Sequence, residues 1–285
     1  MVSCFVKKVV AIFLGVVTLS LALGADRARS LEAPRVFRGV LILEGKIVAG
    51  DYDTLRNFLA TKSTFDKISG GVFLASPGGN LAEAMRIGRL IRALRLSTDA
   101  PSGPAHGRKF GESVITPSDL RDPKTNYQCA SACFLLFVSG IYRNIYWAGR
   151  LGVHRPFQLN SELRKLHGAD QTLIDGRIRR AVESYLREMN VRVKYVELMF
   201  SVPSSDIRWI SQDQLDADLE GFIPELKDVV DAKCAVHSTY FSNMEKTVPV
   251  TPDAGKLARC RLQIEAQLRS EQPAEGWRKV FGGGN

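Results

Sequence analysis

The stretch Gly70-Gly-Val-Phe-Leu-Ala-Ser-Pro-Gly-Gly-Asn80 begins as an apolar strand and ends in a sharp turn. A short apolar run bounded by glycine is consistent with a strand buried on both faces. Residues 81–94 follow at once, with apolar side chains at three- and four-residue steps that predict an amphipathic helix. A strand that passes through a turn into a helix is typical of parallel α/β architecture. The stretch therefore predicts an α/β fold with a largely parallel sheet.

The same alternation continues on both sides of this stretch. Val40-Leu-Ile-Leu43 predicts a second buried strand, and the spacing of apolar residues over 51–60 predicts a helix. Further on, Phe134-Leu-Leu-Phe-Val138 predicts a very apolar helix, and residues 146–153 predict a strand. The longest helical pattern covers residues 162–189. These elements fit one α/β domain.

The chain divides by composition into a leader, one domain and two additions. We expect a signal peptide over 1–25, a linker over 26–35 and the α/β domain over 36–230. Residues 98–128 are rich in Pro, Gly, Ser and charge, which predicts a surface insertion. Residues 231–285 predict a largely irregular C-terminal extension, with a helix over 255–268.

The leader has the order of a secretory signal. Lys7 and Lys8 precede an uncharged apolar run over 9–23, and small residues follow at Ala22, Gly24 and Ala25. The run is short for a bilayer span of about 20 residues. The sequence thus predicts a periplasmic or secreted protein, with an inner-membrane anchor over 9–25 as the alternative.

Composition limits the partners. The 285 residues are 45% hydrophobic and carry a formal charge of +9, but the basic residues are scattered and form no basic-aromatic motif. We expect no nucleic acid partner, and a basic surface suited to proximity to anionic lipid or cell wall. We also expect no cofactor and no metal.

Four cysteines remain once a signal containing Cys4 is removed. An even number in an oxidising compartment predicts disulfides, and four cysteines allow three pairings. The preferred pairing joins Cys234 to Cys260 and Cys129 to Cys133. Zinc is the competing interpretation, but two cysteines four apart without a nearby histidine are a poor ligand set.

Three short segments carry the chemistry. Ser76-Pro-Gly-Gly79 can present backbone N–H groups to a developing negative charge, although it is also simply a good turn. Ser131 opens the apolar helix, where a serine is commonly only an N-cap. His154 follows a predicted strand, and a parallel α/β path returns it to the neighbourhood of Ser131. Histidine is the usual base for a serine nucleophile.

The ordered set Ser-Pro-Gly-Gly, Ala130-Ser-Ala132 and His154-Arg-Pro156, followed by a long helix, resembles the Clp protease proteolytic subunit. The resemblance covers residues 36–223 and extends to the wider Clp/crotonase superfamily, including bacterial periplasmic Clp-like proteins. It implies a repeated β-β-α spiral, Ser131 as nucleophile and His154 as base. It also implies substrate and oxyanion binding at Gly78, Gly79 and Ala132. The helix over 162–189 resembles the family's oligomer-forming element, which implies a homo-oligomer.

The third catalytic residue departs from the family pattern. The family places an Asp immediately before an Arg-aromatic stretch, where this chain has Ile207, and Asp206 lies one residue earlier. Asp206 is the candidate to orient His154, with Asp213 in reserve. Cys129 and Cys133 are also outside the family pattern, and a bond between them would brace the turn around Ser131.

The sequence thus predicts an exported, ATP-independent serine peptidase acting on peptides or unfolded chains. A catalytically weak or inactive scaffold of the same fold is the alternative. A crotonase-like enzyme acting on acyl-coenzyme A is a third hypothesis, and a Ser-Lys mechanism with a lysine elsewhere in the chain is a further variant.

Overall fold

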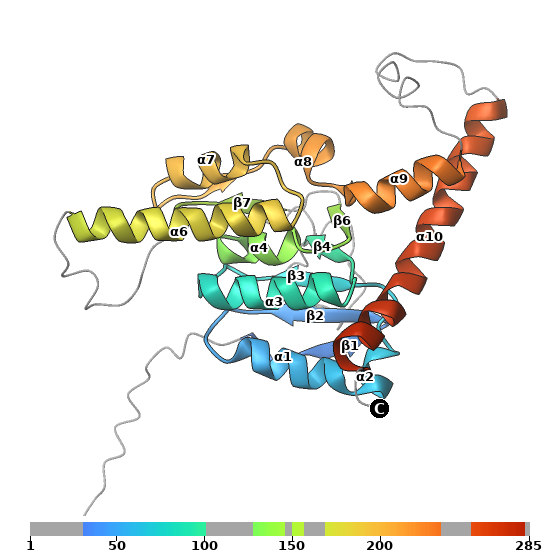
Figure 1. The fold of residues 1–285 in the computed structure, drawn as a ribbon, viewed down its shortest axis with the longest axis horizontal. Coiled ribbons are helices and arrows are strands. Elements are labelled where there is room, and N and C mark those ends of the chain that lie inside the picture. The colour runs from blue at the N-terminus through green and yellow to red at the C-terminus, as the bar shows by residue number, and fades with distance from the viewer. Residues whose placement is uncertain (1–30, 101–127, 146–149, 157–168, 235–251, 283–285) are drawn as a thin grey trace, which may run out of the picture.

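The computed structural model describes residues 31–100, 128–145, 150–156, 169–234 and 252–282 (Figure 1). A six-stranded sheet has the order β1-β2-β3-β4-β6-β9. Its strands are β1 (Arg35–Phe37), β2 (Val40–Glu44), β3 (Val72–Ala75), β4 (Thr98–Ala100), β6 (Tyr142–Ile145) and β9 (Gly221–Phe222). The four central strands pair in parallel, and the two edge strands pair antiparallel. The predicted α/β fold with a largely parallel sheet is confirmed.

A smaller sheet continues the first one. It has the order β5-β7-β8, with β5 (Cys129–Ala130) parallel to β7 (Leu151–Val153), and β7 antiparallel to β8 (Arg208–Trp209). Ser76, one residue beyond β3, forms a parallel bridge with Cys129. This bridge brings the end of β3 beside β5, so that the turns after these two strands face each other.

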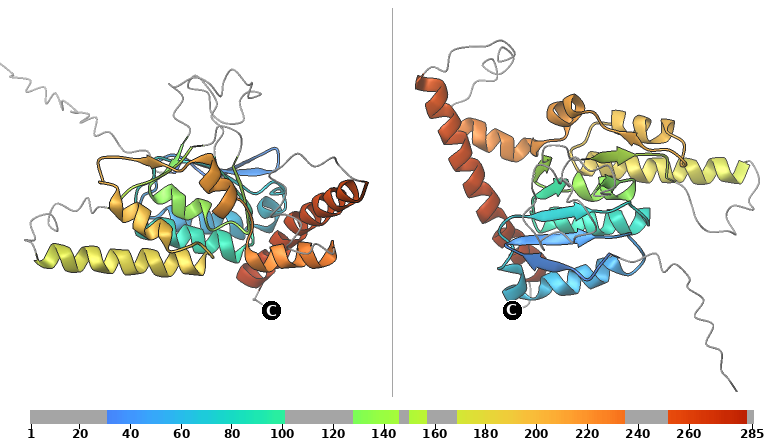
Figure 2. Two further views of the ribbon diagram at one scale, coloured as in Figure 1. Left: turned by 90° about the horizontal axis from the view of Figure 1, so that it is seen from above. Right: turned by 180° about the vertical axis from the view of Figure 1, so that it is seen from behind.

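Helices cover the sheets and bury the core. They are α1 (Asp51–Ala60), α2 (Lys62–Phe65), α3 (Leu81–Ala93), α4 (Ala132–Phe137), α6 (Ala169–Glu188), α7 (Lys194–Ser201), α8 (Gln212–Asp218), α9 (Pro224–Lys233) and α10 (Pro252–Phe281). α1 and α3 lie side by side on one face of the larger sheet (Figures 1 and 2). Every residue of α4 is buried, as its apolar sequence predicts.

The packing of α6 depends on a glycine in α3. The hydroxyl of Tyr185, on α6, donates a hydrogen bond of 2.7 Å to the carbonyl oxygen of Leu135, on α4. A Cβ atom on Gly88 would lie 1.8 Å from that hydroxyl oxygen. Only glycine therefore lets the tyrosine pass α3 and reach α4. This contact fixes α6 over the two helices that carry the pocket described below.

The C-terminal arm, defined here as α9 and α10, corrects one sequence prediction. Within the extension, the predicted helix over 255–268 is confirmed but too short, because residues 252–281 form one helix that packs against α9 and α3. The disulfide Cys234–Cys260 joins the end of α9 to α10, as predicted. In Figure 1 the arm runs along one side of the molecule and returns towards α1 and α2.

The insertion boundary is the second correction. Thr98 to Ala100 form β4 in the middle of the larger sheet, so the segment expected over 98–128 begins later than predicted. Residues 101–127 lie outside the described residues, as do the signal peptide, the first half of the linker and residues 162–168 of the predicted long helix. The β-β-α spiral repeat stays a prediction. Within the described ranges, no helix combines the length and the hydropathy needed to cross a bilayer.

Candidate active site

A cavity of about 390 Å³ opens where the turns after β3, β5 and β7 converge. The carboxyl ends of neighbouring parallel strands are the usual place for ligand sites in open α/β sheets. Its lining includes five residues that the sequence analysis singled out: Gly78, Gly79, Ser131, Ala132 and His154. The structure thus brings three segments that are distant in sequence into one pocket.

Ser131 has an unusual backbone conformation. It lies between β5 and α4 with φ 58° and ψ −122°, a region that residues other than glycine rarely adopt. Such a conformation costs on the order of 1–3 kcal/mol and persists only where the surroundings impose it. The Ser131 side chain makes no capping hydrogen bond to α4. Ser131 therefore occupies the N-cap position without serving as a side-chain cap.

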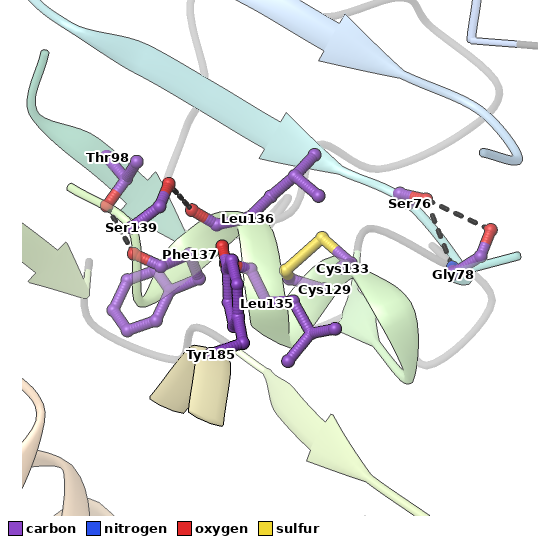
Figure 3. The surroundings of a disulfide bond; sticks show 10 residues. All are labelled: Ser76, Gly78, Thr98, Cys129, Cys133, Leu135, Leu136, Phe137, Ser139 and Tyr185. Atoms are coloured by element: carbon purple, nitrogen blue, oxygen red, sulfur yellow. Dashed lines mark hydrogen bonds between the residues drawn. A yellow bond between two sulfur atoms is a disulfide. The ribbon is translucent and has the colours of Figure 1, made fainter. Parts of the chain in front are cut away.

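Two interactions impose this conformation. The backbone N–H of Ser131 donates to the carbonyl oxygen of Gly152 at 2.9 Å, which extends the pairing of β5 with β7. The disulfide Cys129–Cys133 joins the residue two before Ser131 to the residue two after it. Both cysteines are fully buried, and the bond lies against the first turn of α4 (Figure 3). We call residues 129–133 the Ser131 turn.

Gly78 lets the Ser131 turn approach the end of β3. Its φ is +95°, and a Cβ atom there would lie 2.6 Å from the Cβ of Ser131. Its N–H donates to the hydroxyl of Ser76 at 3.0 Å, a bond visible at the edge of Figure 3. Gly78 therefore contributes close packing, and its N–H is already engaged.

The amides of Gly79 and Ala132 differ from that of Gly78. Within the part of the chain that the structure describes, neither N–H donates a hydrogen bond. Ala132 is the first residue of α4, where backbone N–H groups have no partner inside the helix. Both residues line the cavity beside Ser131. They are two donors that a negatively charged oxygen in the cavity can use.

His154 lies one residue beyond β7 and is 8% exposed. Its Nδ1 is 2.9 Å from the carbonyl oxygen of Arg155. A carbonyl oxygen only accepts, so this hydrogen bond requires a proton on Nδ1 and leaves Nε2 as the basic nitrogen. The Arg155 backbone is itself held, because its N–H donates to Val202 and its guanidinium donates to the carbonyl oxygen of Phe200.

The structure does not bring Asp206 into this arrangement. Asp206 is exposed in the turn that begins at Pro203, and its backbone N–H donates to the Pro203 carbonyl oxygen. It does not line the cavity, and its carboxylate makes no hydrogen bond within the described residues. Asp213 is exposed on α8 and does not line the cavity either. The position next to Nδ1 that the sequence analysis assigned to Asp206 is occupied by a backbone carbonyl.

The remaining walls of the cavity combine residues of the quoted motifs with residues that the sequence patterns did not indicate. They are formed by Lys46, Pro77, Leu81, Pro156 and Met199. Lys46 follows β2, so the available signal was that β2 ends beside β3 in a parallel sheet. Among the described residues, no three His, Cys, Asp or Glu side chains are grouped closely enough to hold a metal ion.

Comparisons with known proteins add little to this geometry. The sequence matches no protein-family model and no curated protein. A solved structure of a mutant of the 1510-N membrane-bound stomatin-specific protease is similar to this chain at 12% sequence identity and a TM-score of 0.41. The similarity covers 71% of this chain and 87% of that one. At that identity and TM-score, no residue's role is assigned from the similarity, and the family that the motifs resemble stays a prediction.

Proposed function

We propose that this protein is a serine hydrolase that cleaves peptide bonds, with Ser131 as the nucleophile and His154 as the general base. The observation that carries the proposal is the shared cavity. It is lined by a serine with strained backbone, a buried histidine and two amide donors that have no acceptor among the described residues. A nucleophile, a base and oxyanion donors in one pocket are the minimum set for acyl transfer.

In the proposed reaction, Nε2 of His154 accepts the proton of the Ser131 hydroxyl as its oxygen attacks the peptide carbonyl carbon. The N–H groups of Gly79 and Ala132 donate to the carbonyl oxygen as it becomes negative. The imidazolium then protonates the leaving amine, and an acyl-enzyme forms on Ser131. Water attacks this ester with His154 again as base, which releases the acid and restores the serine.

With the Arg155 carbonyl in place of an orienting Asp, catalysis is expected to be slower than with a complete triad. The carbonyl can hold His154 in the tautomer with the proton on Nδ1, as an orienting Asp does. It carries no full negative charge, so it stabilises the imidazolium less. We therefore propose a Ser-His pair oriented by backbone rather than the Ser131-His154-Asp206 triad.

A fluorophosphonate probe tests the assignment directly, because it labels only a serine activated by a neighbouring base. Labelling of the full chain is expected on Ser131 and should disappear in Ser131→Ala and fall at least 10³-fold in rate in His154→Ala. Ser201→Ala, at an exposed serine of α7, is the matched control and should label at the normal rate. Asp206→Ala should change the rate less than about threefold, whereas loss of an orienting Asp can cost about 10⁴.

Two results would count against the proposal. Stoichiometric labelling of folded Ser131→Ala would remove Ser131 as the nucleophile. A folded wild-type chain that takes up no probe would instead favour the inactive scaffold, for which the supporting observation is that a backbone carbonyl, and not Asp206, lies next to Nδ1 of His154.

We also propose that the protein acts outside the cytoplasm and assembles with copies of itself. The two disulfides support export, since such bonds persist mainly in oxidising compartments. Self-association through α6 remains a prediction, and the 64% exposure of Leu173 on that helix is compatible with it. Proximity to anionic membrane surfaces rests on the net charge alone.

A further inference from the structure

Lys46 sets the cavity apart from a purely apolar pocket. The walls beyond the proposed catalytic groups are formed by two prolines, Leu81 and Met199, together with the Lys46 side chain. Among the described lining residues, Lys46 is thus the one that carries a full positive charge. A charge held between apolar walls interacts more strongly with a ligand than it would in open water.

The backbone around Lys46 directs its side chain towards the cavity. The next residue, Ile47, forms a parallel bridge with Gly79, in which its N–H donates to Gly78 and its carbonyl oxygen accepts from Asn80. Ile47 is 1% exposed and packs into the core. Successive side chains of an extended segment point to opposite sides, so Lys46 points away from the core. The same pairing fixes Lys46 next to the segment that carries the Gly79 amide.

The acidic residues near this segment are engaged elsewhere. Glu44 pairs with Arg35 at 2.9 Å. Glu83 accepts hydrogen bonds from the backbone N–H groups of Gly50 and Tyr52 and pairs with Arg86. Lys46 forms no ion pair within the described part of the chain. Its ammonium group is therefore available to a carboxylate that enters the cavity.

We infer that Lys46 selects substrates in which a carboxylate lies beside an apolar side chain at the cleavage site. The carboxylate comes from an acidic side chain or from a free C-terminus, and the apolar group packs between Leu81 and Met199. The inference deepens the proposed function, on which it rests, by naming a substrate class. A charge-assisted hydrogen bond is about twice as strong as a neutral one, which makes it an effective source of selectivity.

Lys46 is less suited to act as the base itself. A lysine accepts a proton from serine only when burial removes its own charge, as in catalytic lysines of desolvated sites. Lys46 is only partly buried, whereas His154 is 8% exposed and has its basic nitrogen defined by the Arg155 carbonyl. The base and the charged wall are therefore assigned to different residues.

The experiment compares kcat/KM for matched peptides on the full chain. One pair has capped ends and carries Glu or Gln next to the apolar residue. A second pair carries Gln and ends in a free carboxylate or an amide, which separates the two sources of the charge. The wild-type chain is expected to prefer the carboxylate form of at least one pair by about tenfold, with the preference weakening as salt rises.

Variants then assign the preference to Lys46. Lys46→Met should bring the ratio of the two kcat/KM values near one, and Lys46→Glu should invert it in favour of a peptide with Lys in place of Glu. The matched control is Lys67→Glu, an exposed lysine outside the cavity, which makes the same change in net charge and should keep the wild-type ratio. Thermal unfolding of each variant checks that the fold is retained.

The outcomes separate this inference from the proposed function. Peptide cleavage without carboxylate preference, or an unchanged ratio in Lys46→Glu, would overturn the inference and leave the serine hydrolase standing. A chain that neither cleaves peptides nor takes up the fluorophosphonate probe would overturn the proposed function and the inference together. Loss of all turnover in Lys46→Met, with His154→Ala still active, would make Lys46 the base and also overturn the inference.

Discussion

The Ser131 turn and the C-terminal arm each contain one disulfide, and the two bonds serve different purposes. Cys129 and Cys133 are four residues apart, fully buried and centred on Ser131. Cys234 and Cys260 are 26 residues apart, partly buried, and join two helices outside the pocket. A bond across a short segment mainly restricts local backbone geometry, whereas a bond across a longer one lowers the entropy of the unfolded chain more. The comparison separates a bond that shapes a site from a bond that stabilises a fold.

Removing each disulfide in turn should produce opposite profiles, with the largest effects that we predict. Cys234→Ala with Cys260→Ala should lower the free energy of unfolding by about 3 kcal/mol and change the labelling rate of Ser131 less than about twofold. Cys129→Ala with Cys133→Ala should slow labelling on the order of 10²-fold, since a displacement of about 1 Å at a reacting group costs that much. Urea unfolding and fluorophosphonate labelling measure the two quantities.

The two single-cysteine controls for each pair show whether an effect comes from the bond or from the side chain. Equal slowing of labelling by both double variants would contradict the division, because it would mean that the arm also shapes the pocket.

Alanine at two glycines sharpens the comparison at single-residue resolution. Gly78 and Gly221 have φ values of +95° and +93°. A Cβ at Gly78 would lie 2.6 Å from the Cβ of Ser131, whereas one at Gly221 would have no described atom within 4 Å. Both variants should lose about 1–2 kcal/mol to backbone strain. Gly78→Ala should lose about 1–3 kcal/mol more by overpacking and label at least tenfold more slowly. Indistinguishable unfolding curves for the two variants would contradict this. They would mean that the turns around the pocket move apart to accept the added methyl group without lowering the free energy of unfolding.

The dependence of the unfolding free energy on pH tests the electrostatic effect of the arm on the larger sheet. Asp99 on β4 is 7% exposed, and its burial raises the pKa of the carboxyl to about 6, with opposing contributions from Asn144 and from Arg269 on α10. Because the folded pKa exceeds the unfolded value of about 3.9, the folded state binds the proton more tightly. Stability from this group is full below about pH 4 and is lost as pH rises through 6, by about 2–3 kcal/mol.

Asp99→Asn should remove that step from the dependence of unfolding free energy on pH between 4 and 8. Arg269→Met should make the step larger, because it removes the nearby positive charge that favours the ionised carboxylate. Asp66→Asn, at an exposed carboxylate, controls for the loss of one negative charge. A step that persists in Asp99→Asn would assign it to another group.

Much of the fold could be predicted from the sequence, because the strands and helices of parallel α/β units have strong local sequence patterns. The apolar run of β3, the glycines after it and the periodicity of α3 each leave a pattern within a few residues. Both disulfide pairings were predicted, and both are confirmed. The helix predicted over 255–268 is part of α10, but its continuation to Phe281 was missed because α10 contains Pro273 and packs against α9 and α3 in turn, so that no single apolar stripe runs along it.

The pocket was predictable in its parts but not in its geometry. The convergence of Ser131, His154 and the two glycines followed from the order of motifs, since parallel strands end at one edge of a sheet. The positive φ of Ser131 did not, because pairing with Gly152 and a buried disulfide hold it there. The hydrogen-bond partner of His154 Nδ1 could not be predicted either, because every residue has a backbone carbonyl and no sequence pattern marks the one that is used. Asp206 was predicted instead, since it is an acidic residue close to the expected position.

The return of α10 to the start of the domain sets the limit to which this protein can be shortened. The indole of Trp277 donates to the carbonyl oxygen of Leu59, at the end of α1, and its ring packs near Phe65. A Cβ on the neighbouring Gly276 would lie 2.4 Å from the backbone of Leu94, so helix and core are in direct backbone contact there. Trimming the chain before Trp277 would uncover an apolar patch of the kind that drives aggregation. Every residue lining the described pocket precedes position 200, yet a version that keeps its core covered must extend through α10.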